Sequence, residues 1–176
     1  MIIFDLDGTL ADCEHRRHFV DPKKNADFDW GNGKIAVNYN GEACDYKGDP
    51  FKPDWKAFYE ACDQDVPIDP VRYALEHFYY NEDEIQIWSG RCESVREKTV
   101  DWINRHLGGM KRIKELKMRP IGDNTPDDQL KERWLDEEIS KGNKIDFVFD
   151  DRKKVVRMWR RRGIFVFNCC QNDEEF

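Results

Sequence analysis

The sequence predicts an α/β fold in which a mainly parallel sheet is flanked by helices and carries a lid inserted after its first strand. Short apolar runs that indicate buried strands alternate with helical patterns along most of the chain. Such alternation is typical of a parallel sheet that is covered on both faces. Residues 11–67 break the alternation and show little clean periodicity. Because a long irregular stretch in a compact domain is more often functional than accidental, we interpret it as the lid.

The individual elements follow from apolar runs and from helix boundary signals. Strands are expected at 1–4, 84–88, 145–149 and 164–167, with a weaker candidate at 116–119 that Pro120 would stop. Helices are expected at 69–80, 93–107, 127–139 and 152–162. Pro70 suits the first turn of the first helix, and Gly108-Gly109 would end the second. The core domain would then comprise residues 1–10 and 68–176, with 11–67 as an inserted cap.

The cap segment offers two local predictions. Residues 34–39 could form one strand of a hairpin, and Asp54 could cap a short helix over 54–61. Four of its aromatic residues could stack a nucleic-acid base or could form the small core of the lid itself. They are Trp30, Trp55, Phe58 and Tyr59.

Composition narrows the class of protein. The 176 residues carry a formal net charge of -7, which argues against a protein that coats duplex nucleic acid through a general positive field. No apolar run approaches the roughly 20 residues of a membrane span, and the N-terminus lacks the features of a signal peptide. The six cysteines form no CxxC pair and no zinc-like spacing. We therefore expect a cytoplasmic protein with reduced thiols and no membrane partner.

Polar side chains follow three of the predicted strands at the point where each strand ends. These segments are residues 5–9 (Asp-Leu-Asp-Gly-Thr), 89–91 (Ser-Gly-Arg) and 150–151 (Asp-Asp). The carboxyl ends of parallel strands meet at one edge of a sheet, so the four aspartates would crowd together as like charges. A hard cation relieves such crowding, and oxygen-only ligands favour magnesium (Mg2+). For residues 150–151, capping of the following helix is the alternative interpretation.

This constellation suits phosphoryl chemistry. One carboxylate can attack phosphorus and form an aspartyl-phosphate, while a second protonates the leaving oxygen and later activates water. The transferring phosphoryl group needs cations and hydrogen-bond donors, for which Thr9, Ser89 and Lys131 are candidates. The cluster His15-Arg16-Arg17-His18, just after the acidic turn, could grip a second phosphate or a nucleotide, or could be an ordinary surface cluster.

Together these motifs resemble those of the haloacid dehalogenase (HAD) phosphohydrolase superfamily. Residues 5–10 look like its motif I, Ser89 like motif II, Lys131 like motif III and residues 150–151 like motif IV, in the order of the superfamily. The stretches 122–132 and 149–160 are further similar to the 3′-phosphatase domain of the phage polynucleotide kinase-phosphatase family. The resemblance implies a Rossmann-like HAD core and removal of 3′-phosphates from DNA or RNA ends.

The resemblance also implies roles for individual residues. Asp5 would be the nucleophile and Asp7 the general acid and base, with Lys131 completing the catalytic set. Magnesium would be held by Asp5, by the backbone carbonyl of Asp7 and by Asp150 or Asp151. The substrate-binding candidates are Thr9, Ser89, Gly90, Arg91, Arg119, His15 and Arg16. For the two arginines Arg91 and Arg119, a surface or salt-bridged position is the alternative.

Several functions stay open at this point. No GxxxxGK[ST] loop occurs, so we expect no kinase domain in this chain. The leading hypothesis is a 3′-phosphatase that acts on phosphorylated nucleic-acid ends, and the first alternative is a nucleotidase for free mononucleotides. A phosphotransferase or mutase would use the same aspartate. A non-catalytic binding module on the HAD scaffold is a fourth possibility, which the intact acidic motifs disfavour.

Overall fold

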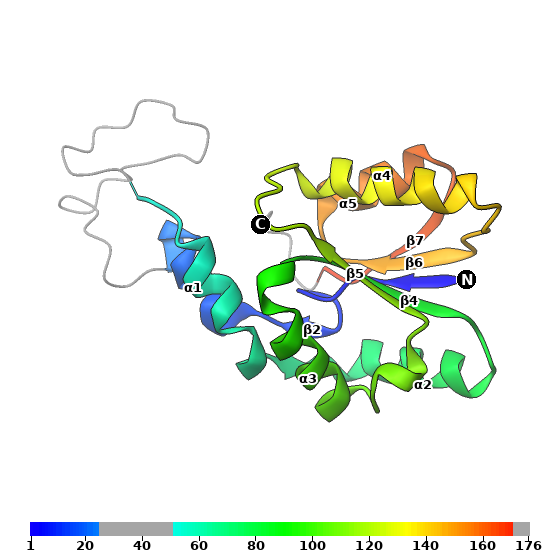
Figure 1. Ribbon diagram of the computed structural model, residues 1–176, viewed down its shortest axis with the longest axis horizontal. Helices are drawn as coiled ribbons and strands as arrows, with labels where there is room; N and C mark the ends of the chain where they lie inside the picture. The colour runs from blue at the N-terminus through cyan, green and yellow to red at the C-terminus, as the bar shows by residue number, and fades with distance from the viewer. Residues whose placement is uncertain (25–50, 171–176) are drawn as a thin grey trace. The chain divides into compact units, whose positions relative to one another are not determined.

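The computed structural model describes residues 1–24 and 51–170, which build a five-stranded and a two-stranded sheet with five α-helices (Figure 1). All neighbours in the larger sheet are parallel, so the predicted α/β class is confirmed. Its strands are β5 (Glu115–Arg119), β4 (Ile85–Cys92), β1 (Ile2–Phe4), β6 (Phe147–Asp150) and β7 (Phe165–Asn168), in that spatial order. The smaller antiparallel sheet pairs β2 (Ala11–Asp12) with β3 (Val66–Pro67). The helices are α1 (Trp55–Glu60), α2 (Asp69–Tyr80), α3 (Arg96–His106), α4 (Asp127–Ser140) and α5 (Lys153–Arg161).

Strand β1 lies at the centre of the larger sheet. Ile3 is in register with Gln86 of β4 on one side and with Val148 of β6 on the other. The chain adds β4 and β5 on the first side and then returns to add β6 and β7 on the second. The strand order therefore reverses beside β1, and ligands of open α/β sheets bind at the carboxyl ends of the strands at such a point.

Helices cover both faces of this sheet, with α4 and α5 on one side and α2 and α3 on the other (Figure 1). On the α2 side, the ring of Phe4 stacks on that of Phe149 at 4.5 Å, and Phe78 packs against both rings. On the other side, Trp134 of α4 and Trp159 of α5 enclose one core cluster with strand residues. This two-sided burial explains why the strands are almost continuously apolar.

Most predicted elements occur, but β4 differs from its prediction. The run 84–88 was expected to end before Ser89-Gly90-Arg91, whereas the strand continues to Cys92. Pairing with β5 continues past Ser89 through a register shift between Ser89 and Cys92, and this irregularity extends the strand. The weaker candidate at 116–119 is confirmed as β5.

Contacts divide the chain into two units, which are Met1–Cys13 with Asp63–Phe176, and Glu14–Cys62. The first unit also holds the 3₁₀ turns Glu93–Val95 and Met110–Arg112, and the second holds Glu14–Phe19 and Pro22–Lys24. A further 3₁₀ turn, Cys62–Gln64, crosses the boundary between the units. In the second unit Asp54 caps α1, as predicted, by accepting a hydrogen bond from the backbone N of Ala57 at 2.9 Å. The predicted strand at 34–39 and Trp30 lie outside the described residues. Among the described helices, none combines the length and apolar character needed to cross a membrane.

Candidate active site

Lys131 lies between two carboxylates that come from adjacent strands. Its Nζ is 2.7 Å from Oδ1 of Asp5, which follows β1, and 2.8 Å from Oδ2 of Asp150, the last residue of β6. All three side chains are buried. Lys131 reaches them from the first half of α4, whose axis runs along the sheet. A buried cation and two buried anions need each other, because removal of one partner leaves an uncompensated charge in a poorly solvated place.

Burial and charge pairing shift the pKa values of Asp5 and Lys131. Burial raises the pKa of Asp5 well above its ordinary value, while the charge of Lys131 opposes the rise. Burial alone would lower the pKa of Lys131, but the charges of Asp150 and Asp5 outweigh it, and its pKa is raised. Lys131 is therefore held as an ammonium ion, which can donate to Asp5, to Asp150 and to an anionic ligand.

Asp151 completes a cluster of three carboxylates. One oxygen each from Asp5, Asp150 and Asp151 lies within 4.8 Å of the others. Oδ1 of Asp151 accepts a hydrogen bond from Oγ1 of Thr9 at 3.2 Å. Burial and the charge of Asp150 raise the pKa of Asp151 to about 6. Three acids with one lysine leave an excess of negative charge in this cluster.

Gly8 makes the approach of Asp151 possible. Its φ of +87° lies in the left-handed region, and a Cβ built on it would lie 2.1 Å from Oδ2 of Asp151. A side chain at this position would therefore face both backbone strain and a clash with a carboxylate. The glycine predicted to permit a sharp turn thus also leaves the space that Asp151 occupies.

The three carboxylates fit a hard divalent cation. The donor set consists of oxygen atoms alone, which is the set that magnesium and calcium prefer. A bound cation would offset the excess negative charge of the cluster. It would also lower the raised pKa values of Asp5 and Asp151, because a positive charge favours the ionised carboxylate. Helix capping does not account for Asp151, because the N-cap of α5 is Arg152 and has no side-chain cap bond. Asp150 does accept a hydrogen bond from the backbone N of Arg152, at 3.1 Å.

Asp7 pairs with a buried arginine. Its Oδ1 accepts hydrogen bonds from Nε and Nη2 of Arg91 at 2.9 and 2.5 Å. The same Nη2 lies 2.5 Å from Oδ2 of Asp65, in a pair whose two side chains are both fully buried. The backbone O of Asp65 in turn accepts a hydrogen bond from Nε1 of Trp102 at 2.6 Å. Arg91 is therefore ion-paired, as the alternative interpretation expected, and it fixes the position of Asp7.

Arg119 also lies in a network of hydrogen bonds and ion pairs within the first unit. Its Nε donates to the backbone O of Gly90 at 3.0 Å, and its Nη2 pairs with Asp127. Asp127 pairs in addition with Arg152. A Cβ on Gly90 would lie 2.9 Å from Oδ1 of Asp127, so the glycine gives this carboxylate room. The network braces the loop after β5 against the starts of α4 and α5.

The remaining predicted substrate-binding residues are placed as follows. Oγ of Ser89 is buried and accepts a hydrogen bond from the backbone N of Arg91 at 3.1 Å. His15 and Arg16 belong to the second unit, where the guanidinium of Arg16 is buried, donates to the backbone O of Phe58 at 3.1 Å and lies over the Phe58 ring. Contact of any of these residues with substrate stays a prediction.

Two acids at this site were not identified from the sequence. Asp65 lies in the irregular stretch 11–67, where no local pattern distinguishes a buried acid from a solvated one. Asp127 could have been found, since it precedes Lys131 by four residues and side chains at that spacing share one face of a helix.

Comparison with known proteins agrees with this fold. The structure resembles a chain in the solved structure of the Pnkp1/Rnl/Hen1 RNA repair complex, with a TM-score of 0.62 at 24% identity. The match covers 95% of this chain and 41% of the other. The structure also resembles a haloacid dehalogenase-like family hydrolase from Streptococcus pneumoniae (TM-score 0.57, 15% identity, 95% and 82% of the two chains). CbbY from Rhodobacter sphaeroides, solved in complex with phosphate, gives a TM-score of 0.55 at 14% identity over 98% and 88% of the chains.

One curated relative is more similar in sequence. It is a protein of Autographa californica nuclear polyhedrosis virus named "Putative bifunctional polynucleotide kinase/RNA ligase", 33% identical over 141 residues. The match covers 76% of this chain and 20% of the relative. The chain therefore spans about a fifth of the length of that relative.

A family model described as the polynucleotide kinase PNKP phosphatase domain matches residues 54–174. This match identifies the chain as a phosphomonoesterase of the HAD superfamily, as the sequence predicted, and the fold and the acidic cluster agree with it. The chain therefore belongs to the family of PNKP phosphatase domains.

Proposed function

We propose that the chain hydrolyses 3′-phosphates at nucleic-acid ends with the help of Mg2+, and that Asp5 is the nucleophile. The observation that carries this proposal is the pairing of Asp5 and Asp150 with Lys131, beside Asp151, at the carboxyl ends of β1 and β6. Membership of the PNKP phosphatase family, together with relatives named for polynucleotide kinase, RNA ligase and RNA repair, supports the polynucleotide as substrate.

In the first step an oxygen of the Asp5 carboxylate attacks phosphorus, and the bond from phosphorus to the leaving 3′-oxygen breaks. Asp7, positioned by Arg91, gives a proton to that oxygen, which leaves as a hydroxyl group. In the second step water attacks the phosphorus of the aspartyl-phosphate, and Asp7 takes the proton of the water. Phosphate is released, and Asp5 is again a carboxylate.

The surrounding groups stabilise charge. Lys131 and the hydroxyl groups of Thr9 and Ser89 would donate to the phosphoryl oxygens. Magnesium would be held by Asp5, by the backbone carbonyl of Asp7, and by Asp150 or Asp151. When bound, it supplies positive charge that offsets the negative charge of the carboxylates and the phosphoryl group.

Phosphate release from a 3′-phosphorylated oligonucleotide tests the proposal, measured with magnesium beside a panel of 3′- and 5′-mononucleotides. We expect release from the oligonucleotide and none from the Asp5→Asn variant. Faster release from the mononucleotides would favour the nucleotidase alternative over action at strand ends. Activity retained by Asp5→Asn would contradict the mechanism.

A further inference from the structure

The outward face of helix α5 carries only basic side chains. Of its nine residues, four are buried and apolar, and all the others are lysine or arginine. With 3.6 residues per turn, the exposed ones lie within one arc of about 120° around the helix. On a chain with a formal net charge of -7, this face is a local concentration of positive charge. The residues of this basic face of α5 are Lys154, Arg157, Arg160 and Arg161.

Helix stability does not account for all of these cations. The helix dipole favours basic residues in the last turn, where Arg160 and Arg161 lie. It disfavours them in the first turn, which nevertheless contains Lys153 and Lys154 and no acidic residue. Arg161 pairs with Glu132 of α4, whereas Lys154 and Arg160 have no ion-pair partner within the part of the chain that the structure describes. These two cations are therefore available to an anion from outside the chain.

The basic face begins close to the active site and leads away from it. Lys154 follows Asp151 by three residues, so the Cα atoms of the two are at most about 11 Å apart. Because β6 and β7 are parallel, the helix that joins them runs back from the carboxyl ends of the strands, where the carboxylates lie. Arg160 follows Lys154 by six residues, which is about 9 Å along the helix axis.

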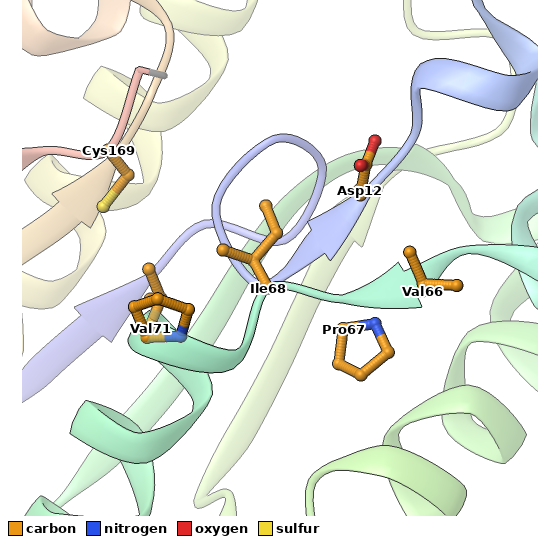
Figure 2. A pocket seen from close by; sticks show the side chains of 7 residues that line it. Asp12, Val66, Pro67, Ile68, Val71 and Cys169 are labelled. Carbon is orange, nitrogen blue, oxygen red and sulfur yellow. The ribbon is translucent and has the colours of Figure 1, made fainter.

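A pocket of about 530 Å³ in the same unit is less suited to a nucleic-acid backbone (Figure 2). Its walls come from the β2–β3 sheet, the start of α2 and the segment after β7 (Figure 2). None of the described residues that line it is a lysine, an arginine or a histidine. Because proteins bind the phosphates of nucleic acids mainly through lysine and arginine, the basic face of α5 fits a backbone better than this pocket does.

We propose that the basic face of α5 binds the phosphodiester backbone of the single strand whose 3′-phosphate is removed. The assignment rests on the proposed function, because it takes the 3′ end of the strand to lie at Asp5. Along a nucleic-acid helix, one strand has a phosphate about every 3.4 Å. The roughly 9 Å between Lys154 and Arg160 therefore spans the phosphates of different nucleotides. A single strand fits better than a duplex, because the neighbouring acids Glu132 and Asp136 of α4 would repel a second strand.

The double variant Lys154→Gln with Arg160→Gln tests the assignment, and Lys111→Gln with Lys114→Gln is the matched control. The control also removes two exposed cations, but at the amino end of β5, away from the carboxyl ends of the strands. The probe is a fluorescein-labelled oligothymidylate of about 12 nucleotides with a 3′-hydroxyl end. Its Kd is measured by fluorescence anisotropy at several salt concentrations.

We expect the α5 double variant to bind the probe about tenfold more weakly at low salt. The slope of log Kd against log salt should fall by about 1.4, because two phosphate contacts are lost. The control should keep the wild-type Kd and slope. Unchanged binding by a folded α5 variant, equal weakening in both variants, or no binding by the wild type at low salt would overturn the assignment. Displacement of the probe by poly-L-glutamate at equal charge would also overturn it and would indicate an acidic protein partner.

A second measurement uses the reaction. With magnesium, the wild type should have a higher kcat/KM for a 3′-phosphorylated oligothymidylate than for thymidine 3′-monophosphate. The α5 double variant should lower this ratio by about tenfold and keep the wild-type rate on the mononucleotide. An unchanged ratio would contradict the assignment. If no 3′-phosphorylated substrate released phosphate, the proposed function would fail, while weaker binding of the probe by the α5 variant alone would still support the basic face as a backbone-binding surface.

Discussion

The carboxylate of Asp151 lies so close to Gly8 that no side chain fits at position 8. The Cβ that Gly8 lacks would lie 2.1 Å from Oδ2 of Asp151, and the φ of Gly8 is +87°. The motif Asp5-Leu6-Asp7-Gly8-Thr9 therefore depends on a residue that is 142 positions away from its threonine, through the hydrogen bond between Thr9 and Asp151.

We predict that Gly8→Ala destabilises the protein by about 1–3 kcal/mol from backbone strain and displaces Asp151, with loss of phosphatase activity. Gly142→Ala is the matched control, since Gly142 has a φ of +79° and open space around its missing Cβ. Chemical denaturation and phosphate release should show a similar strain cost in both variants, with activity lost in Gly8→Ala alone. Equal activity in the two variants would contradict the role of the close approach.

We predict that Lys131→Met lowers kcat/KM by about a hundredfold or more, because it removes the cation that lies between Asp5 and Asp150. Arg133→Met is the control on the same helix, since Arg133 is about half exposed and pairs with Asp123. Steady-state kinetics with a 3′-phosphorylated oligonucleotide measure both. Comparable rates for Lys131→Met and wild type would exclude Lys131 from catalysis.

We predict that Asp65→Asn weakens the hold of Arg91 on Asp7 and so impairs protonation of the leaving oxygen. A substrate with a good leaving group, such as p-nitrophenyl phosphate, has less need of that proton than a nucleotide. The rate on the nucleotide should therefore fall by about tenfold more than the rate on the aryl phosphate. Asp63→Asn serves as control, since only the backbone O of Asp63 takes part in a described hydrogen bond. An equal fall on both substrates would indicate a purely structural role for Asp65.

Glu138 gives a prediction about stability and pH. It is buried and accepts hydrogen bonds from Lys117 at 2.7 Å, Lys141 at 2.8 Å and Asn143 at 2.6 Å. Burial favours the protonated acid, but these hydrogen bonds outweigh it and lower the pKa of Glu138 to about 2. Because the folded-state pKa lies below the unfolded value of 4.5, the stabilisation is complete above about pH 4.5 and is lost as the pH falls toward 2.

Glu138→Gln should therefore lower the free energy of unfolding at pH 7 by about 2 kcal/mol and should flatten its dependence on pH between about 4.5 and 2. Urea denaturation at several pH values measures both effects. Glu137→Gln, at the neighbouring and half-exposed position, should change neither strongly. An identical pH profile for wild type and Glu138→Gln would refute the assignment.

The sequence predicted the parts of this molecule whose signals are local. Residues 69–80 form α2 as expected, because helical spacing and a first-turn proline occur together there. Asp5, Asp150 and Asp151 could be identified because they directly follow the predicted apolar strands 1–4 and 145–149. Asp65 was missed because its burial against Arg91 depends on the packing of segments 26 residues apart, which no local pattern records. The extension of β4 was missed because it depends on pairing with β5.

The central place of β1 has a consequence for how the protein is made. Ile2, Ile3 and Phe4 pair with β4, more than 80 residues later, and with β6, about 145 residues later. Contacts so distant along the chain close large loops, which slows folding. On the ribosome, the turn that carries Asp5 is synthesised well before its partners Lys131 and Asp150, since Lys131 follows Asp5 by 126 residues. The site therefore assembles only after β6 has been synthesised.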